Sequence, residues 1–158
     1  LRSNGKNPNR YSHSAESLLK RVIKENKLYQ INNVVDFNNW LSIKYLIPVG
    51  TYDLDEIKGD IVLKIGADDD TIQSLRSESL KINGVPALFD EEGAFGNIIS
   101  DSKRTLIKKS TTNILSVFFF FQIPKNVDSL KNELLHLFEN KLNAKSVSIK
   151  AYNNGKNL

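Results

Sequence analysis

The apolar stretch from Asn113 to Ile123 constrains the fold most, because it contains four consecutive phenylalanines at positions 118–121. Its longest uninterrupted apolar run begins at Val117 and is much too short to cross a bilayer, since a spanning helix needs about 20 apolar residues. Aromatic side chains at this density are typical of a strand that is covered on both faces. We therefore expect 113–123 to form a deeply buried strand in a folded domain.

Apolar residues recur at helical spacing in three further segments. The first begins at Ser14, with Ser12 or Ser14 as its cap, and the last begins at Asp128, which we expect to cap it. The second covers 32–45, where we expect Trp40 in the core rather than on the surface as a platform for stacked bases. Strands are predicted at 60–65, 79–82, 86–89 and 146–152, and the polar, glycine-bearing segment 90–105 is predicted to be a loop.

Helices and strands that do not alternate regularly indicate an α+β fold. The chain has 158 residues, of which 40% are hydrophobic and 25% charged, and this suits one domain with one core. We expect a single domain with about three helices and a mixed, mainly antiparallel sheet. Its predicted parts are an N-terminal arm at 1–12, the domain itself at 13–152 and a fraying tail at 153–158.

The composition limits the chemistry that the chain can perform. It contains no Cys, which excludes disulfides and thiolate metal sites. Of its two histidines, we expect His13 to be exposed on the surface, and we assign neither it nor His136 to chemistry. The acidic run 68–70 lacks the ligand spacing of a calcium loop, so we expect a solvated turn, no metal and no cofactor.

Nothing near the N-terminus reads as a signal peptide, and we expect a cytoplasmic location without membrane association. The chain has no Met and begins at Leu1, which we interpret as a fragment, a processed chain or a sequence with missing Met letters.

Charge is distributed unevenly along the chain, although the net charge is only +4. Residues 1–50 carry eight Lys or Arg against three acids, 51–100 carry four against eleven, and 101–158 carry ten against four. Basic flanks can attract the phosphates of a nucleic acid by releasing counterions. They can equally serve to keep the surface soluble, and the charge pattern leaves both interpretations open.

Two runs of sequence carry a family resemblance. In DFNNWLSIKYLIPVGTYDLDEIKGDIVLKIG (36–66), an Asp, an Asn and a helix precede Pro48, the aromatic–acid pair Tyr52–Asp53 and an Asp-x-Ile-x-Gly-x-Ile-Val pattern. In LKINGVPALFDEEGAFGNIISDSKRTLIKKSTTNILSVFFF (80–120), a glycine-bearing loop lies between two strands. Over about residues 10–121 the chain resembles the B3/B4 (tRNA-binding, editing) domain of the phenylalanyl-tRNA synthetase beta subunit. Segment 91–105 is more similar to freestanding versions, so we expect a domain without a synthetase core.

The resemblance implies a tRNA-associated role and a pocket that hydrolyses wrongly attached tyrosine. Two polar residues mark that pocket in the family, and the matching positions here are Gly50, where the family has His, and Val117, where it has Glu. Because the Glu would read the tyrosine hydroxyl, the substitutions imply a smaller or more apolar amino acid, or none.

The candidate site residues gather in two polar clusters. In the first, glycine N–H groups can hold an ester oxyanion while a polar side chain orients water. We assign catalysis there to Asp101, Ser102, Arg104 and Thr105, and substrate contacts to Asp90, Glu92, Gly93, Phe95 and Gly96; an ordinary surface loop is the alternative. The second cluster lines a pocket or caps helices, and with the family positions it comprises Asn32, Asn33, Asp36, Asn38, Gly50, Tyr52 and Val117.

Three functions remain open at this point. The chain is a deacylase that clears mischarged tRNA, a module that binds tRNA or another RNA without chemistry, or a binder of amino acids or other small molecules that does not bind RNA. We favour the first two together, with tRNA or aminoacyl-tRNA as the partner. No protein partner can be deduced, and a complete tRNA ligase is excluded because the chain has no room for an ATP-binding core.

Overall fold

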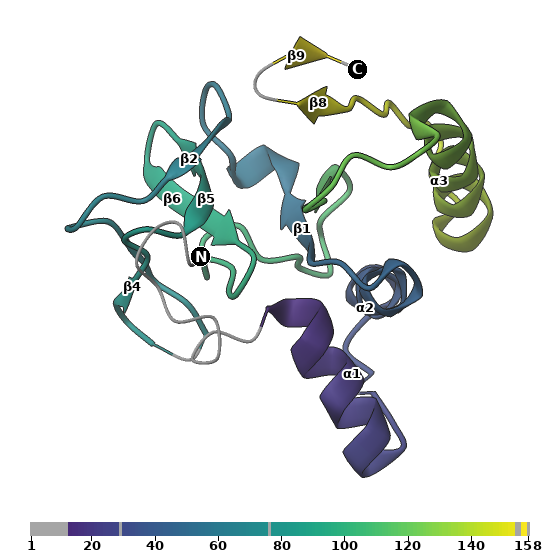
Figure 1. Cartoon of the computed structure of the whole chain (residues 1–158), viewed down its shortest axis with the longest axis horizontal. Helices are drawn as coiled ribbons and strands as arrows, with labels where there is room; N and C mark the ends of the chain where they lie inside the picture. Colours follow the sequence, from purple (N-terminus) through teal and green to yellow (C-terminus); the bar gives the residue numbers. More distant parts are fainter. Residues whose placement is uncertain (1–12, 29, 76, 154–155, 158) are drawn as a thin grey trace.

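The computed structural model describes residues 13–28, 30–75, 77–153 and 156–157. Its helices are α1 (Ser14–Glu25), α2 (Asn33–Tyr45), the 3₁₀ helix η3 (Leu54–Glu56) and α3 (Val127–Leu142) (Figure 1). The strands are β1 (Val49–Asp53), β2 (Val62–Ile65), β3 (Thr71–Ile72), β4 (Leu80–Lys81), β5 (Pro86–Asp90), β6 (Gly93–Asn97), β7 (Ile114–Phe118), β8 (Tyr152–Asn153) and β9 (Lys156–Asn157). The predicted arm at 1–12 lies outside the described residues.

The strands form several small sheets rather than one large one. β1 pairs with β7, β5 lies between β2 and β6, β3 pairs with β4, and β8 pairs with β9. Each of these described strand pairs is antiparallel. Together with three α-helices, this confirms the predicted α+β class.

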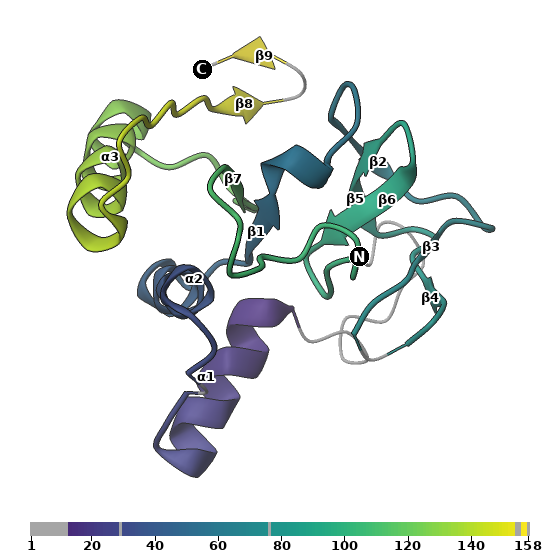
Figure 2. The same ribbon diagram turned by 180° about the vertical axis from the view of Figure 1, so that it is seen from behind.

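The β1–β7 pair lies between the helices and the β2–β5–β6 sheet, as both ribbon views show (Figures 1 and 2). Side chains alternate across a strand, so the pair can serve two cores. Val49, Ile114 and Phe118 pack with α2 and α3. Tyr52, Leu115 and Val117 pack with residues of β5 and β6. This central position brings the two halves of the chain together.

The aromatic run is less buried than its composition predicts. β7 ends at Phe118, and Phe119 is buried, but Phe120 is 38% exposed and Phe121 63% exposed. The reason is that β7 pairs only with β1 among the described strands, and the Phe119 N–H donates to the carbonyl of Pro48, the residue just before β1 begins. The chain leaves the sheet there, so the expectation of burial through Phe121 is wrong.

The three α-helices begin where sequence periodicity places them, but their caps differ. Ser14 is the first residue of α1, and the cap is His13, whose Nδ1 accepts from the Glu16 N–H at 3.3 Å. His13 is therefore half-buried rather than exposed as predicted. Asp128 lies inside α3, which is capped by the Asn126 side chain. Ser12 lies outside the described residues.

Several local predictions are also corrected by the structure. Trp40 is 42% exposed, because Phe37 takes the core position on α2. The predicted loop 90–105 contains strand β6, which forms a hairpin with β5 across a turn where Gly93 adopts a φ of 116°. Such a φ favours glycine. Of the predicted strand 146–152 only Tyr152 is in a strand, and the tail forms the short β8–β9 pair.

Candidate functional site

The centre of the candidate site is the β1–β7 register, which places Gly50 directly opposite Val117. In the family that the sequence resembles, the position of Gly50 carries a His and the position of Val117 carries a Glu. The next pair on the same face is Tyr52 opposite Leu115. The register therefore brings together the two predicted pocket positions, and it places the Tyr52 side chain beside them.

Tyr52 is fully buried between the two sheets. Its ring meets the Phe95 ring edge-on, with centroids 5.0 Å apart. Its hydroxyl donates a hydrogen bond of 2.8 Å to Oδ1 of Asp101. Asp101 is brought there by the turn after β6, because it bridges back to Gly96 and the Ser102 N–H donates to the Phe95 carbonyl.

Two glycines make room for the Tyr52 side chain. A Cβ at Gly50 would lie 2.6 Å from Tyr52 Cζ, and a Cβ at Gly96 would overlap the Tyr52 hydroxyl. Both glycines are buried, and neither could carry a side chain unless Tyr52 moved. The Tyr52 hydroxyl therefore fills the space into which a residue at position 50 would first extend.

Burial shifts the titration of both partners. It raises the pKa of Asp101 to about 6, although the hydrogen bond from Tyr52 acts in the opposite direction. Burial, the nearby Asp101 carboxylate and their hydrogen bond raise the Tyr52 pKa well above its usual range. Tyr52 consequently stays protonated near neutral pH, while Asp101 changes its charge there and is able to accept a proton.

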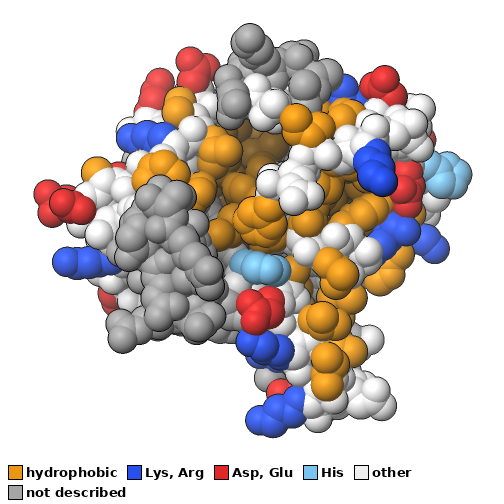
Figure 3. Space-filling model, viewed as in Figure 1, with side chains coloured by type: hydrophobic (Ala, Val, Ile, Leu, Met, Phe, Trp, Pro, Cys, Tyr) orange, Lys and Arg blue, Asp and Glu red, His pale blue; other side chains and the backbone are white. Residues whose placement is uncertain are grey.

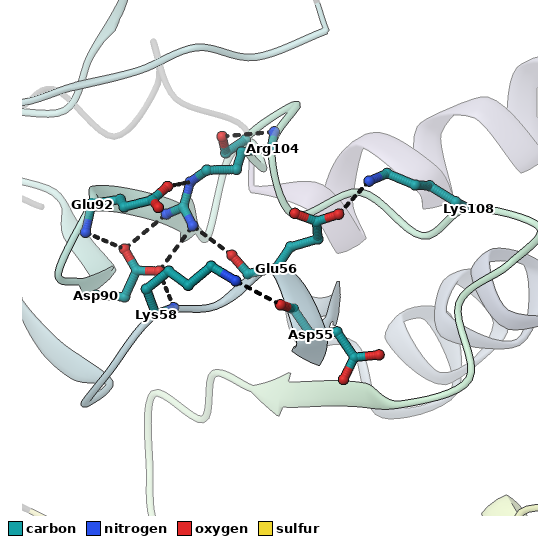
Figure 4. Close-up of polar contacts among 8 residues, drawn as sticks. Asp55, Glu56, Lys58, Asp90, Glu92, Arg104 and Lys108 are labelled. Atoms are coloured by element: carbon teal, nitrogen blue, oxygen red, sulfur yellow. Dashed lines mark hydrogen bonds and ion pairs between the residues drawn. The ribbon is translucent and has the colours of Figure 1, made fainter.

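Arg104 belongs to a neighbouring ionic cluster (Figure 4). Its guanidinium donates two hydrogen bonds to the Asp90 carboxylate, at 2.8 and 2.9 Å, and one of 2.7 Å to the Glu56 carbonyl. Glu92 approaches its Nε at 3.4 Å. Lys108 forms an ion pair with the Glu56 side chain on the far side of the cluster. This arrangement fastens the β5–β6 hairpin to η3.

The Asp90 carboxylate is the buried centre of this cluster, with a side chain that is 0% exposed. Burial works to raise its pKa, but the Arg104 guanidinium and the main-chain N–H groups of Lys58 and Glu92 outweigh burial and lower it. Asp90 therefore stays ionised, and Arg104 is committed to it. This geometry gives the pair a structural role.

Ser102 and Thr105 are buried beneath the same segment. Ser102 Oγ accepts from the Arg104 N–H at 3.2 Å, and the Thr105 carbonyl accepts from the Asp53 N–H at 2.9 Å. Within the described part of the chain, the Thr105 hydroxyl has no hydrogen-bond partner. Of the four predicted catalytic residues, Asp101 is the half-buried one that contacts Tyr52.

The asparagine-rich cluster divides between two places. Asn32 Oδ1 accepts from the Val35 N–H at 2.9 Å and caps α2, while Asp36 Oδ1 accepts from the Ile31 N–H at 2.9 Å, just before the helix. Asn33 bonds its neighbour, Val34. Asn38 lies apart from them and accepts from the Thr51 hydroxyl, which also contacts Ser116 Oγ at 3.1 Å. These three hydrogen-bonded side chains lie on the face of the β1–β7 pair that is turned towards the helices, and Tyr52 lies on the other face.

The open face of the molecule is hydrophobic at its centre, where Figure 3 shows orange side chains around a hollow. Among the exposed hydrophobic residues are Phe120, Phe121 and Ile123, and the Phe121 ring lies 5.8 Å from the His13 ring. In the described residues, no group of three or more His, Cys, Asp or Glu is placed to hold a metal ion. No described helix is long and apolar enough to cross a membrane.

The fold and the site define a small α+β domain whose sheets meet at a buried tyrosine, which is flanked by glycines and bonded to a half-buried aspartate. The model of the B3/4 domain family matches residues 2–152, and the chain belongs to this family.

Its relatives include the beta subunit of phenylalanine–tRNA ligase from Mycoplasma genitalium, 28% identical over 148 residues, which are 90% of this chain and 18% of the relative. The beta subunit from Fusobacterium nucleatum subsp. nucleatum is 29% identical over 118 residues, 73% of this chain and 15% of the relative. The chain spans less than a fifth of the length of these relatives.

Residue spacing did not indicate the Tyr52–Asp101 hydrogen bond, although both residues were candidates. The two lie 49 positions apart in sequence. In the structure two glycines, Gly50 and Gly96, lie against the Tyr52 side chain, but they are far apart in the sequence and gave no local signal of the contact. A buried aromatic ring that must pass close to backbone requires glycine at the contact.

Proposed function

We propose that this chain binds aminoacyl-tRNA and hydrolyses the ester of a mischarged one. Family membership supports the tRNA association, since the relatives are subunits of phenylalanine–tRNA ligases. The observation that carries the hydrolytic part is Asp101, a half-buried carboxylate whose pKa burial raises to about 6. A carboxylate tuned towards neutral pH suits general-base catalysis. A role on tRNA also implies the cytoplasmic location predicted from the sequence.

In the proposed reaction, Asp101 takes a proton from a water molecule, and the water oxygen attacks the ester carbonyl carbon. The bond between that carbon and the ribose oxygen breaks, and the ribose oxygen takes up the proton from Asp101. The Tyr52 hydroxyl holds the carboxylate in position at 2.8 Å throughout. Main-chain N–H groups near Gly96 are the proposed donors to the oxyanion.

The proposed substrate carries an amino acid that is smaller or more apolar than tyrosine. Gly50 and Val117 offer no polar side chain at the two facing positions, and Tyr52 occupies the space beside Gly50. A site that discriminates a hydroxyl needs a hydrogen-bonding partner for it, and these two positions supply none.

The alternative is a tRNA-binding module without hydrolysis. It is favoured because the Arg104 guanidinium already bonds Asp90 and the Glu56 carbonyl. Ser102 and Thr105 are buried, which keeps them away from a substrate. On this alternative, Asp101 serves only to anchor Tyr52.

Deacylation of a panel of mischarged tRNAs separates the two. Release of one amino acid by the intact protein, lost in Asp101→Asn and kept in Asp69→Asn, supports the hydrolase. Asp69 lies in the exposed turn at 68–70 and is the matched carboxylate control. No release from any member, at protein concentrations where tRNA is bound, contradicts hydrolysis and leaves the binding module. A free amino acid that raises the melting temperature, with no tRNA binding, contradicts both.

A further inference from the structure

Trp40 is an exposed aromatic residue with a rigid support. Its indole, on α2, stacks against the Phe37 ring with centroids 5.7 Å apart and an angle of 20° between the planes. Phe37 is buried and meets the Phe138 ring of α3 edge-on at 5.2 Å. The core therefore fixes Phe37, and Phe37 supports an indole that stays 42% exposed.

A hollow of about 380 Å³ lies at this place, between α2 and α3. The described residues that line it are Phe37, Trp40 and Lys141, which are two aromatic rings and one ammonium group. A second ammonium, that of Lys44, lies 5.7 Å from the centre of the Trp40 ring and pairs with Glu133 at 3.0 Å. In Figure 3, Lys and Arg side chains (blue) lie beside hydrophobic ones over the region of α2 and α3.

A stacked aromatic ring beside a lysine matches the chemistry of a nucleotide. Bases stack on aromatic side chains whatever their sequence, because every base has a π face, and a neighbouring cation meets the phosphate. An apolar protein segment would bury the indole as well, but it would leave Lys141 without an anionic partner in the hollow.

We propose that the hollow formed by Phe37, Trp40 and Lys141 is a nucleotide subsite for a single-stranded segment of RNA. One base stacks on the Trp40 indole, and its phosphate contacts the Lys141 ammonium. This inference rests on the proposed association with tRNA and names a part of the surface that contacts it. The subsite lies on α2 and α3, on the helix side of the β1–β7 pair, whereas Asp101 lies on the opposite side.

The test uses the fact that Trp40 is the only tryptophan in the sequence. The intact protein is titrated with a short single-stranded oligoribonucleotide and, separately, with total tRNA, while tryptophan fluorescence and the anisotropy of end-labelled RNA are recorded. The expected result is saturable quenching with the same midpoint as the anisotropy change. Stacking on one base is worth about 1–3 kcal/mol, so Trp40→Ala should weaken binding about 5- to 150-fold, and Trp40→Phe should restore most of it.

Lys141→Ala should weaken binding and flatten its dependence on salt by about one unit of log–log slope. Leu63→Ala, an exposed apolar residue on β2, and Lys81→Ala, an exposed lysine on β4, are the matched controls and should change neither quantity. Circular dichroism confirms that each variant is folded.

Binding of tRNA with unchanged tryptophan fluorescence, and with equal affinity in Trp40→Ala, overturns the subsite and leaves the proposed function standing. Quenching by the oligonucleotide without hydrolysis of any mischarged tRNA supports the subsite and contradicts the hydrolytic part of the proposed function. Absence of any RNA binding overturns both. Quenching by an apolar peptide but not by RNA also overturns the subsite, in favour of a protein partner.

Discussion

Replacing Asp101 with Asn should change how the stability of the protein depends on pH. Burial raises the pKa of Asp101 from 3.8 to about 6 in the folded protein. A carboxyl group with a raised pKa binds its proton more tightly in the folded than in the unfolded state. Its contribution to stability is therefore fully present below pH 4 and is lost as the pH rises through 6.

The size of the effect follows from the two pKa values. The difference between 3.8 and about 6, at about 1.4 kcal/mol for each pKa unit, amounts to about 3 kcal/mol. Most of this loss falls between pH 4 and pH 7. Asn at position 101 cannot ionise and can still accept from the Tyr52 hydroxyl, so the variant should escape the loss. Relative to the native protein, Asp101→Asn should gain about 2–3 kcal/mol of unfolding free energy between pH 4 and pH 8.

Urea denaturation of both proteins at one-unit pH intervals from 4 to 8, followed by circular dichroism, measures the difference. Taking the difference removes the contributions of all other titrating groups, including Asp90, whose lowered pKa acts with the opposite sign. Asp69→Asn, at an exposed turn position, is the matched control substitution. Parallel stability curves for the native protein and Asp101→Asn would contradict the raised pKa, because Asp101 would then titrate alike in the folded and unfolded states.

Three further substitutions probe the same region. Tyr52→Phe removes the hydrogen bond that holds the Asp101 pKa down, so that pKa should rise above 6, as measured by NMR titration of the carboxyl carbon. Gly96→Ala forces the buried Tyr52 side chain to move and should cost about 1–3 kcal/mol of unfolding free energy in urea. Arg104→Met leaves the Asp90 carboxylate buried without its main partner and should cost about 3–5 kcal/mol, visible as a large drop in melting temperature.

Each of these has a control and a contradicting result. The Asp101 pKa should not move in Tyr45→Phe, and a fall in Tyr52→Phe would show that the hydroxyl is not its donor. Gly93→Ala is the control for Gly96→Ala, because Gly93 has open space around it and the loss of unfolding free energy there comes from its φ alone. A Gly96→Ala variant as stable as the native protein would contradict the close contact between position 96 and Tyr52. The control for Arg104→Met is Lys103→Ala, which breaks an exposed ion pair and should cost less than about 1 kcal/mol of unfolding free energy. An equally small loss in Arg104→Met would contradict a stabilising role for the buried ion pair between Arg104 and Asp90.

Local features of the fold could be predicted from the sequence because they depend on near neighbours. The start of α2 is an example, since Asn32 caps it through the Val35 N–H, only three residues away. The starts of α1 and α3 depend on near neighbours in the same way. The phenylalanine run could not be placed correctly, because the exposure of Phe120 and Phe121 depends on where pairing with β1 stops.

The site itself depends on contacts that local pattern does not encode. Tyr52 reaches Asp101 across 49 residues, and Arg104 reaches the Glu56 carbonyl across 48. The polar segment 90–105 looked like a loop because its glycines hide the apolar strand β6. The segment supplies Asp101, which bonds Tyr52, and the ion pair of Asp90 with Arg104. The sequence identified all three residues as candidates. It could not show that Arg104 pairs with Asp90 while Asp101 bonds Tyr52 and has a raised pKa.

Single-turnover hydrolysis of mischarged tRNA between pH 5 and pH 8 tests the central claim most directly. We expect one member of the panel to lose its amino acid at a rate that rises about tenfold per pH unit below 6 and levels off above it. Asp101→Asn should abolish this pH-dependent rate while still binding the tRNA. Hydrolysis at the uncatalysed rate across the whole pH range, with tRNA bound, would contradict the claim that Asp101 makes this chain a deacylase.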